Sequence, residues 1–131
     1  MRPALRVAIL ADDLIWAGRL HRIVRDAGGA SMGARTAGAF AATLSGTSGT
    51  GGSDRPAAAI VDLTSRGYEP FSAIRAAVAS GVPVVAVGRH DDRAGRAAAL
   101  AAGATHVYPY ARLHATGPGV IRAWLEEVQA R

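Results

Sequence analysis

Three aspartates follow apolar segments, at positions where carboxylates could do chemistry. Asp12 and Asp13 come at the end of the apolar run of residues 6–11, and Asp62 lies near the end of the run of residues 56–63. In open parallel sheets, ligands bind beyond the carboxyl ends of the strands, so these acids are expected at one edge. Carboxylate oxygens suit a hard cation such as Mg²⁺, which could hold a phosphoryl group against one of them.

A simpler interpretation assigns these acids to local structure. Asp13 would cap the helix that follows it, and Asp62 would bond its own loop. Against this, Asp62 ends a segment as apolar as AAAIVDL. A charge in such surroundings needs a cation or a hydrogen-bond donor as a partner. Both interpretations stay open at this point.

The elements that must position these acids alternate along the chain. Short apolar runs predict strands at residues 6–11, 30–36, 56–63, 82–87 and 105–108. Apolar spacing and capping residues predict helices at residues 13–27, 37–44, 69–80, from Asp91 or Asp92 to Ala102, and from Thr116 onward with Pro118 in its first turn. Five strand–helix units predict a three-layer α/β sandwich with a parallel sheet.

Length and composition favour a single domain over residues 1–131. The chain has 131 residues, half of them apolar, which is enough to bury one core. Residues 45–55, rich in Gly, Ser and Thr, are predicted to form a flexible surface loop. The chain has no cysteine, no run long enough to span a membrane and no evident export signal, so a cytoplasmic protein is expected.

The charge pattern argues against direct nucleic-acid binding. The net charge is +5, and every one of the 15 basic residues in the Lys+Arg count is arginine. The arginines are scattered, and no window holds a dense basic run interleaved with aromatic residues. No glycine-rich phosphate loop follows a predicted strand.

Four segments together resemble the response-regulator receiver (CheY-like) domain of bacterial two-component signalling. They are ILADD, IVDLT, VPVVAVG and AAGATHVYPY, and the match runs nearly end to end. The resemblance implies a flavodoxin-like (βα)5 fold with strand order 2-1-3-4-5. It also implies that Asp62 is the phosphoacceptor, and that Asp12, Asp13, Asp62 and the backbone carbonyl of Thr64 bind Mg²⁺.

The sequence departs from the receiver pattern at the switch positions. The hydroxyl residue expected after the fourth strand is Gly88, and the switch aromatic falls on Val107. The expected lysine is replaced by Tyr110, or by Tyr108 if Pro109 is matched to the proline that follows the lysine, and the chain has no lysine at all. The two arginines that could substitute for this cation are Arg89 and Arg112.

These departures predict a degenerate pseudo-receiver that acts through protein contacts, with weak or no phosphoacceptance at Asp62. Its expected partners are a histidine kinase or an output protein, and the segment of residues 90–130 would form a homodimer face. The first alternative is a functional Mg²⁺-dependent receiver, whose only chemistry is phosphoryl acceptance at Asp62. The second is a small α/β nucleotide-binding or enzymatic domain that uses the same acids.

Overall fold

The computed structural model describes residues 4–46 and 55–131, and most of the loop predicted at residues 45–55 lies outside these ranges. Strands and helices alternate throughout the described chain. The strands are β1 (Arg6–Leu10), β2 (Ala30–Ala34), β3 (Ala58–Asp62), β4 (Val84–Gly88) and β5 (Val107–Pro109). The helices are α1 (Leu14–Asp26), α2 (Ala37–Ser45), α3 (Pro70–Ala79), α4 (Arg93–Ala102) and α5 (Tyr110–Gln129).

The strands form one parallel sheet in the order β2-β1-β3-β4-β5, which confirms the predicted fold class and topology. Every residue of β3 and β4 is buried. This matches their nearly continuous apolar sequence, because central parallel strands are covered on both faces. The sheet is therefore the middle layer of a three-layer sandwich.

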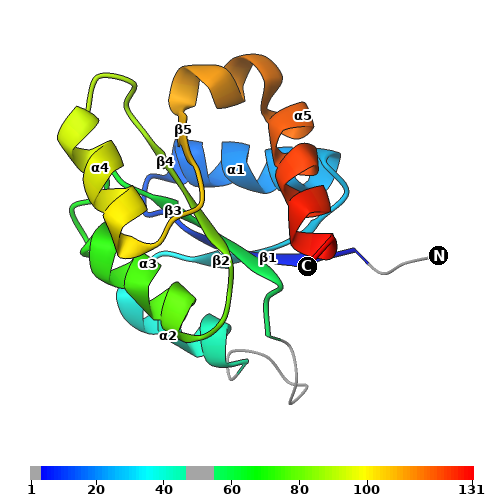
Figure 1. The fold of residues 1–131 in the computed structure, drawn as a ribbon, viewed down its shortest axis with the longest axis horizontal. Coiled ribbons are helices and arrows are strands. Elements are labelled where there is room, and N and C mark those ends of the chain that lie inside the picture. Colours follow the sequence, from blue (N-terminus) through cyan, green and yellow to red (C-terminus); the bar gives the residue numbers. More distant parts are fainter. Residues whose placement is uncertain (1–3, 47–54) are drawn as a thin grey trace.

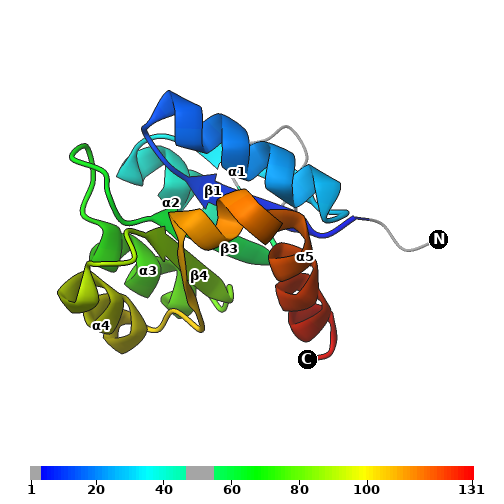
Figure 2. The ribbon, with the colours of Figure 1, turned by 90° about the horizontal axis from the view of Figure 1, so that it is seen from above.

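Two apolar cores hold the layers together. Alternate residues of the strands face α2, α3 and α4 on one side and α1 and α5 on the other. Figures 1 and 2 show these two groups of helices on opposite sides of the sheet. The largest buried side chains are Phe40 in the first core and Trp124 in the second. Because the cores flank the sheet, the carboxyl ends of the strands remain at one exposed edge.

Side-chain caps fix where the helices begin. Asp13 accepts hydrogen bonds from the backbone N–H groups of Ile15 and Trp16, at 2.9 and 3.0 Å. Asp92, rather than Asp91, caps α4 by accepting from the N–H of Gly95 at 2.8 Å. The capping role predicted for Asp13 is therefore confirmed, and it draws this carboxylate toward its own helix.

The last helix differs from the prediction. Helix α5 begins at Tyr110, earlier than predicted, and consists of two helical segments separated at Thr116, whose backbone leaves the helical region with φ −141° and ψ 28°. The Thr116 hydroxyl donates to the carbonyl oxygen of Arg112 (3.2 Å), so its hydrogen bond stabilises the preceding turn. Pro118 follows this kink and has no N–H to continue the ladder. The second helical segment of α5 therefore begins after Thr116, with Pro118 in its first turn as predicted, and the prediction missed the first segment, from Tyr110.

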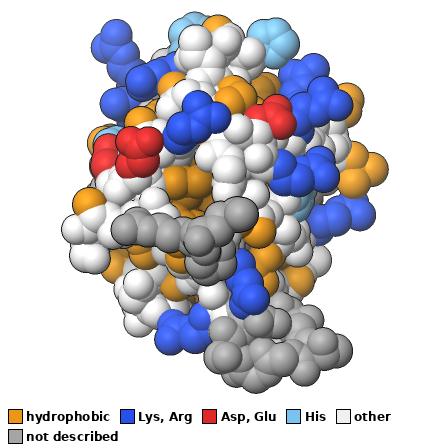
Figure 3. Space-filling model, turned by 90° about the vertical axis from the view of Figure 1, so that its right-hand side faces the viewer, with side chains coloured by type: hydrophobic (Ala, Val, Ile, Leu, Met, Phe, Trp, Pro, Cys, Tyr) orange, Lys and Arg blue, Asp and Glu red, His pale blue; other side chains and the backbone are white. Residues whose placement is uncertain are grey.

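The surface carries arginines in separate groups. Figure 3 shows one face of the molecule, where basic side chains are separated by uncharged surface and by acidic side chains. This agrees with the scattering of arginine along the sequence. None of the helices in the described residues has the length and apolar character needed to cross a membrane.

Candidate functional site

Asp62 is the last residue of β3 and only 1% of its surface is exposed. Its Oδ1 accepts hydrogen bonds from the backbone N–H of Thr64 (3.0 Å), from the Thr64 hydroxyl (2.9 Å) and from the Tyr110 hydroxyl. A buried carboxylate needs such donors, since burial without partners is strongly unfavourable. Among the described residues, therefore, only uncharged groups donate hydrogen bonds to this oxygen.

Tyr110 reaches Asp62 from the first position of α5. Its hydroxyl also lies 2.6 Å from the hydroxyl of Thr64, so three oxygens converge on one point. The ring of Tyr110 packs against that of Trp16 in α1, with centroids 4.1 Å apart. Burial, followed by the hydrogen bond to Asp62, raises the pKa of Tyr110 well above its ordinary value. The hydroxyl consequently stays protonated, and a donor, at neutral pH.

Asp12 is brought to the same edge through the loop that follows β3. Its Oδ2 accepts from the hydroxyl of Ser65 (2.6 Å) and from the N–H of Gly67 (3.2 Å). A Cβ at Gly67 would lie 2.7 Å from this oxygen, so the contact depends on glycine. Asp62 bonds Thr64 in the same loop, and both acids thus hold one segment in place.

Tyr68 ties the ends of the two central strands together below these acids. Its hydroxyl donates to the carbonyl oxygen of Asp62 (2.6 Å) and lies 3.1 Å from the carbonyl oxygen of Leu10. Burial raises the pKa of Tyr68, and the nearby charges of Asp62 and Asp12 raise it further. Both pKa shifts in this site, at Tyr68 and Tyr110, keep a phenol neutral beside buried carboxylate charge.

Each of the three acids accepts hydrogen bonds from the described chain. Within residues 4–46 and 55–131, no group of three or more His, Asp and Glu side chains could hold a metal ion. Asp13 is committed to its helix cap, and Asp12 and Asp62 each have an oxygen occupied by donors from the loop. Mg²⁺ binding by Asp12, Asp13, Asp62 and the Thr64 carbonyl stays a prediction from the resemblance.

The structure separates the two tyrosines that could take the place of the missing lysine. Tyr108 turns into the core under α1 and α5, stacked on His106 with centroids 5.5 Å apart. Its hydroxyl makes no hydrogen bond with the described residues, whereas that of Tyr110 bonds Asp62. Tyr110 is therefore the residue that stands beside the predicted phosphoacceptor.

The other two switch positions lie on β4 and β5, and Gly88 directly follows Val87, which pairs with Asp62. Val107 packs against the core under α2, α3 and α4. Gly88 ends β4, and a Cβ built on it would lie 3.2 Å from Cδ1 of Leu63. Leu63 thus covers this position closely and leaves little room for a side chain there.

Neither substitute arginine reaches Asp62. Arg89 pairs with Asp91, with Nε and Oδ1 3.3 Å apart, and the guanidinium of Arg112 lies over the ring of Tyr108 at 5.5 Å. No described arginine or histidine donates a hydrogen bond to Asp62. Within residues 4–46 and 55–131, no cationic side chain bonds this carboxylate to supply the positive charge that would neutralise a phosphoryl group.

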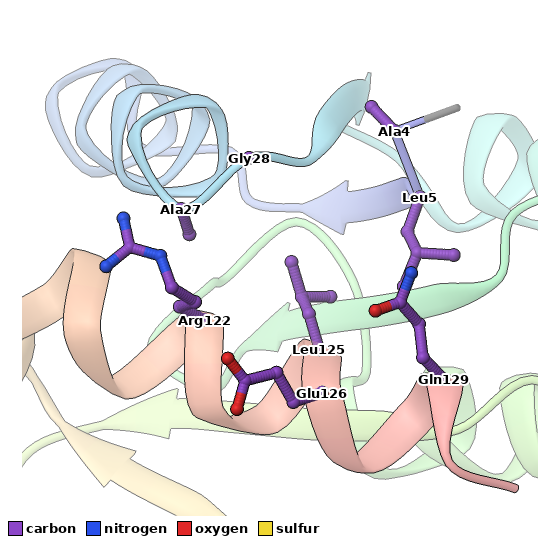
Figure 4. A pocket seen from close by; sticks show the side chains of 8 residues that line it. All are labelled: Ala4, Leu5, Ala27, Gly28, Arg122, Leu125, Glu126 and Gln129. Atoms are coloured by element: carbon purple, nitrogen blue, oxygen red, sulfur yellow. The ribbon is translucent and has the colours of Figure 1, made fainter. Parts of the chain in front are cut away.

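At the opposite end of the sheet, a hollow lies beside a hydrogen bond that joins α5 to α1. It holds about 300 Å³ and is lined by Leu5, Arg122, Leu125 and Glu126 among others (Figure 4). Arg122 donates to the carbonyl oxygen of Asp26 at the end of α1, at 2.9 Å. This bond joins α5 to α1, and the hollow lies far from the aspartates at the other edge.

Comparisons with solved structures identify the fold. Over 98% of its length, the chain is similar to a protein from Chloroflexus aurantiacus J-10-fl described as a response regulator (TM-score 0.78, 17% identity, 99% of that chain). It is also similar to the BeF3-activated DrrB receiver domain (0.73, 14%, 98% of this chain and 99% of that one). The response regulator RPA3017 of R. palustris red light signaling matches 92% of this chain with 90% of its own (0.76, 14%). The chain has the receiver fold.

The similarity to receiver domains is found when structures are compared, and not when sequences are compared. A scan of the sequence against models of known protein families finds no match, and a search of curated proteins finds none either. The receiver fold explains why Asp12 and Asp62 share one edge, since both follow central strands. It leaves the chemistry of that edge to its particular side chains.

Three residues of the site were not predicted from the sequence. Ser65, Gly67 and Tyr68 were not predicted to contact the acids, although all three lie in the loop after β3. Ser and Gly mark this segment as a loop, but the sequence holds no signal that it bonds Asp12, which lies more than fifty positions away. Tyr68 carries no signal either, because its role depends on the pairing of β1 with β3.

Proposed function

We propose that this chain is a receiver-like signalling domain of two-component type that works through protein–protein contacts, with weak or no phosphoacceptance at Asp62. One observation carries the proposal. The Tyr110 hydroxyl, a neutral donor, bonds Oδ1 of Asp62 where the receiver pattern has lysine. The receiver fold and the two acids at one edge support the signalling part, and the tyrosine supports the loss of efficient phosphotransfer.

The chemistry of acyl phosphate formation explains why this replacement matters. A carboxylate oxygen of Asp62 would form a bond to phosphorus while the bond from phosphorus to the donor's leaving group breaks. The phosphoryl oxygens then add negative charge in a site that is already acidic. Removing one positioned electrostatic contact typically slows such a step by about 100- to 1000-fold. A phenol that holds its proton cannot supply the missing positive charge.

Contact with other proteins is supported by apolar surface beside the site. Leu14 and Ile15, in the first turn of α1, are 68% and 67% exposed. Adjacent exposed aliphatic side chains at the rim of a site are a feature of interaction surfaces. A histidine kinase or an output protein is the proposed partner, and the face formed by α4, β5 and α5 is the proposed homodimer surface.

The alternative of a functional phosphoacceptor is favoured by one observation. Asp12 and Asp62 do lie at the same edge, held by one loop. A nucleotide-binding or enzymatic role that uses these acids has less support, because neither Asp12 nor Asp62 lines the hollows of about 300 and 540 Å³, and the hollow beside Gly88 and Arg89 holds only about 80 Å³. Ligand pockets usually have volumes of roughly 300 to 1,000 Å³.

Phosphoryl-analogue binding tests the proposal. The full chain, labelled with ¹⁵N, is titrated with beryllofluoride at millimolar Mg²⁺ while the indole N–H signal of Trp16 is followed. We expect no saturable shift in the native protein and a gain of saturable binding in Tyr110→Lys. Adding Asp62→Asn to that variant should abolish the gain. Saturable binding to the native chain that Asp62→Asn removes would overturn the proposal and support an ordinary receiver.

A further inference from the structure

Strand β2 forms an open edge of the sheet. It pairs only with β1, through bonds such as those from Ala30 N to Leu5 O (2.8 Å) and from Ala11 N to Ala34 O (3.1 Å). Because the backbone polar groups of successive residues point to opposite sides of a strand, Ser31 and Gly33 turn theirs outward. No described residue bonds these outward N–H and C=O groups.

This edge lacks the features that usually protect one. Natural edge strands carry charged residues, proline or bulges that prevent pairing with another chain. The β2 sequence ASMGA has neither a charge nor a proline, and it pairs with β1 in continuous register. Figure 2 shows α1 and α2 beside this end of the sheet. Between them, Gly33 is exposed. The edge is therefore open to a further strand.

A hollow of about 540 Å³ runs along this edge between α1 and β2. Gly33 in β2 and Gly18 in α1 keep it open, since neither has a side chain to fill it. Leu14, which is 68% exposed, also lines it. A strand laid along β2 would direct alternate side chains into this space, which suits apolar side chains.

The charges around the hollow indicate the charge of the partner that would bind there. His21 and Arg35 line it, and no acidic residue does. Burial lowers the pKa of His21 and the charge of nearby Arg25 lowers it further, so His21 is uncharged at neutral pH and the cations of this region are Arg35 and Arg25. A second copy of the chain would bring the same cations to the seam, and each copy carries a net charge of +5. An acidic segment of another protein is the complementary occupant.

We propose that the β2 edge and the adjoining hollow bind an extended peptide segment of another protein, in which acidic residues flank an apolar one. The segment pairs with the outward groups of Ser31 and Gly33 as a sixth strand. Its apolar side chain enters the hollow, and its acids face Arg35 and Arg25. This site is separate from Asp62 and does not depend on the function proposed above.

A defined peptide tests the proposal on the full chain. The probe is the blocked peptide Asp-Glu-Val-Thr-Leu-Thr-Val-Glu-Asp, and the control peptide carries lysine in place of each acid. Binding is followed by ¹⁵N NMR titration and by hydrogen exchange of the Ser31 and Gly33 amides. We expect saturable binding of the acidic peptide, slower exchange at one or both of these amides, and at least tenfold weaker binding of the lysine peptide.

Matched variants separate the hollow from the rest of the surface. A Cβ at Gly18 meets no atom within 4 Å, so Gly18→Ala adds a methyl group without a clash and leaves most of the hollow open, whereas Gly18→Leu extends a larger apolar side chain from the same point into it. Both replacements suit a helix better than glycine does. We expect Gly18→Leu to abolish binding and Gly18→Ala to retain it. Arg35→Glu should weaken binding of the acidic peptide about tenfold, through loss of attraction and added repulsion.

Three results would overturn the proposal. The first is the absence of saturable binding by the acidic peptide. The second is binding that shifts signals only outside α1 and β2, or that survives Gly18→Leu unchanged. The third is protection of the Ser31 and Gly33 amides that rises with protein concentration when no peptide is added, because the occupant would then be a second copy. The same titration on Asp62→Asn should be unchanged, which keeps this result distinct from the phosphoacceptor test.

Discussion

Replacing Tyr110 by phenylalanine measures what the tyrosine hydroxyl contributes to the site. The substitution keeps the ring contact with Trp16 and removes one of three donors to Oδ1 of Asp62. Hydrogen bonds to charged groups contribute about 1.5 to 3 kcal/mol. Because both donors from Thr64 remain, we expect the lower part of that range, a loss of about 1.5 to 2 kcal/mol in the free energy of unfolding. For a domain of this size the Tm should fall by roughly 5 to 10 °C.

The assay is urea unfolding followed by far-ultraviolet circular dichroism, which does not depend on the environment of Trp16. Tyr108→Phe is the matched control, since the Tyr108 hydroxyl makes no hydrogen bond with the described residues, and it should cost less than about 0.5 kcal/mol. Equal losses in the two variants would refute the assigned role of Tyr110. Thr64→Val extends the test, because combining it with Tyr110→Phe leaves Oδ1 of Asp62 with a single backbone donor. The double variant should lose more than the sum of the two single losses, by about 0.5 kcal/mol or more.

Three further predictions follow from the pKa shifts and from one close contact. Tyr68 and Tyr110 have pKa values raised above the ordinary 10.0, so the stability that they contribute is present below pH 10 and is lost as the pH rises above it, by up to about 1.4 kcal/mol per pH unit for each. Absorbance at 295 nm should therefore show tyrosinate near pH 10.5 in urea but not from these two residues in the folded chain. His21 has a pKa lowered from 6.5, so its contribution is present above pH 6.5 and declines as the pH falls below it. The unfolding free energy of His21→Gln should fall less between pH 7 and pH 5, and an unchanged slope would contradict this. Gly67→Ala should destabilise the chain by about 0.5 to 1.5 kcal/mol in urea unfolding, because the new Cβ would lie 2.7 Å from Oδ2 of Asp12 and would turn this carboxylate away from its donors; wild-type stability would show that the contact is absent in solution.

Much of the fold follows from local patterns that survive in the folded chain. The apolar runs become buried strands because parallel strands need no polar face. Gly103 ends α4 with φ 116°, a conformation that favours glycine, and the predicted end of this helix is confirmed. Asp13 and Asp92 cap their helices through bonds that span two or three residues, which is the range over which sequence reasoning is strongest.

The site was harder to predict because its contacts join distant segments. Tyr110 and Asp62 are 48 positions apart, and Asp12 bonds Ser65 across 53. The sequence left Tyr110 and Tyr108 as alternatives, because the choice between them depends on where α5 begins. Once the helix begins at Tyr110, the side chain of that residue is directed across the carboxyl ends of the strands toward Asp62. The boundary of one helix thus decides which residue stands beside the acid.

The hydrogen bonds around Asp62 also determine how a modification of this carboxylate would affect α5 and α1. Tyr110 joins this carboxylate to α5, and its ring contacts Trp16 in α1, over which the guanidinium of Arg19 lies at 5.2 Å. A group attached to Oδ1 of Asp62 must displace the tyrosine hydroxyl and so disturb the contact with Trp16. Because Leu14 begins the same helix, a partner that binds there and favours the present position of Tyr110 would oppose modification of Asp62. By linkage, modification would weaken that partner's binding by the same factor, so Tyr110 would couple Asp62 to the proposed partner surface.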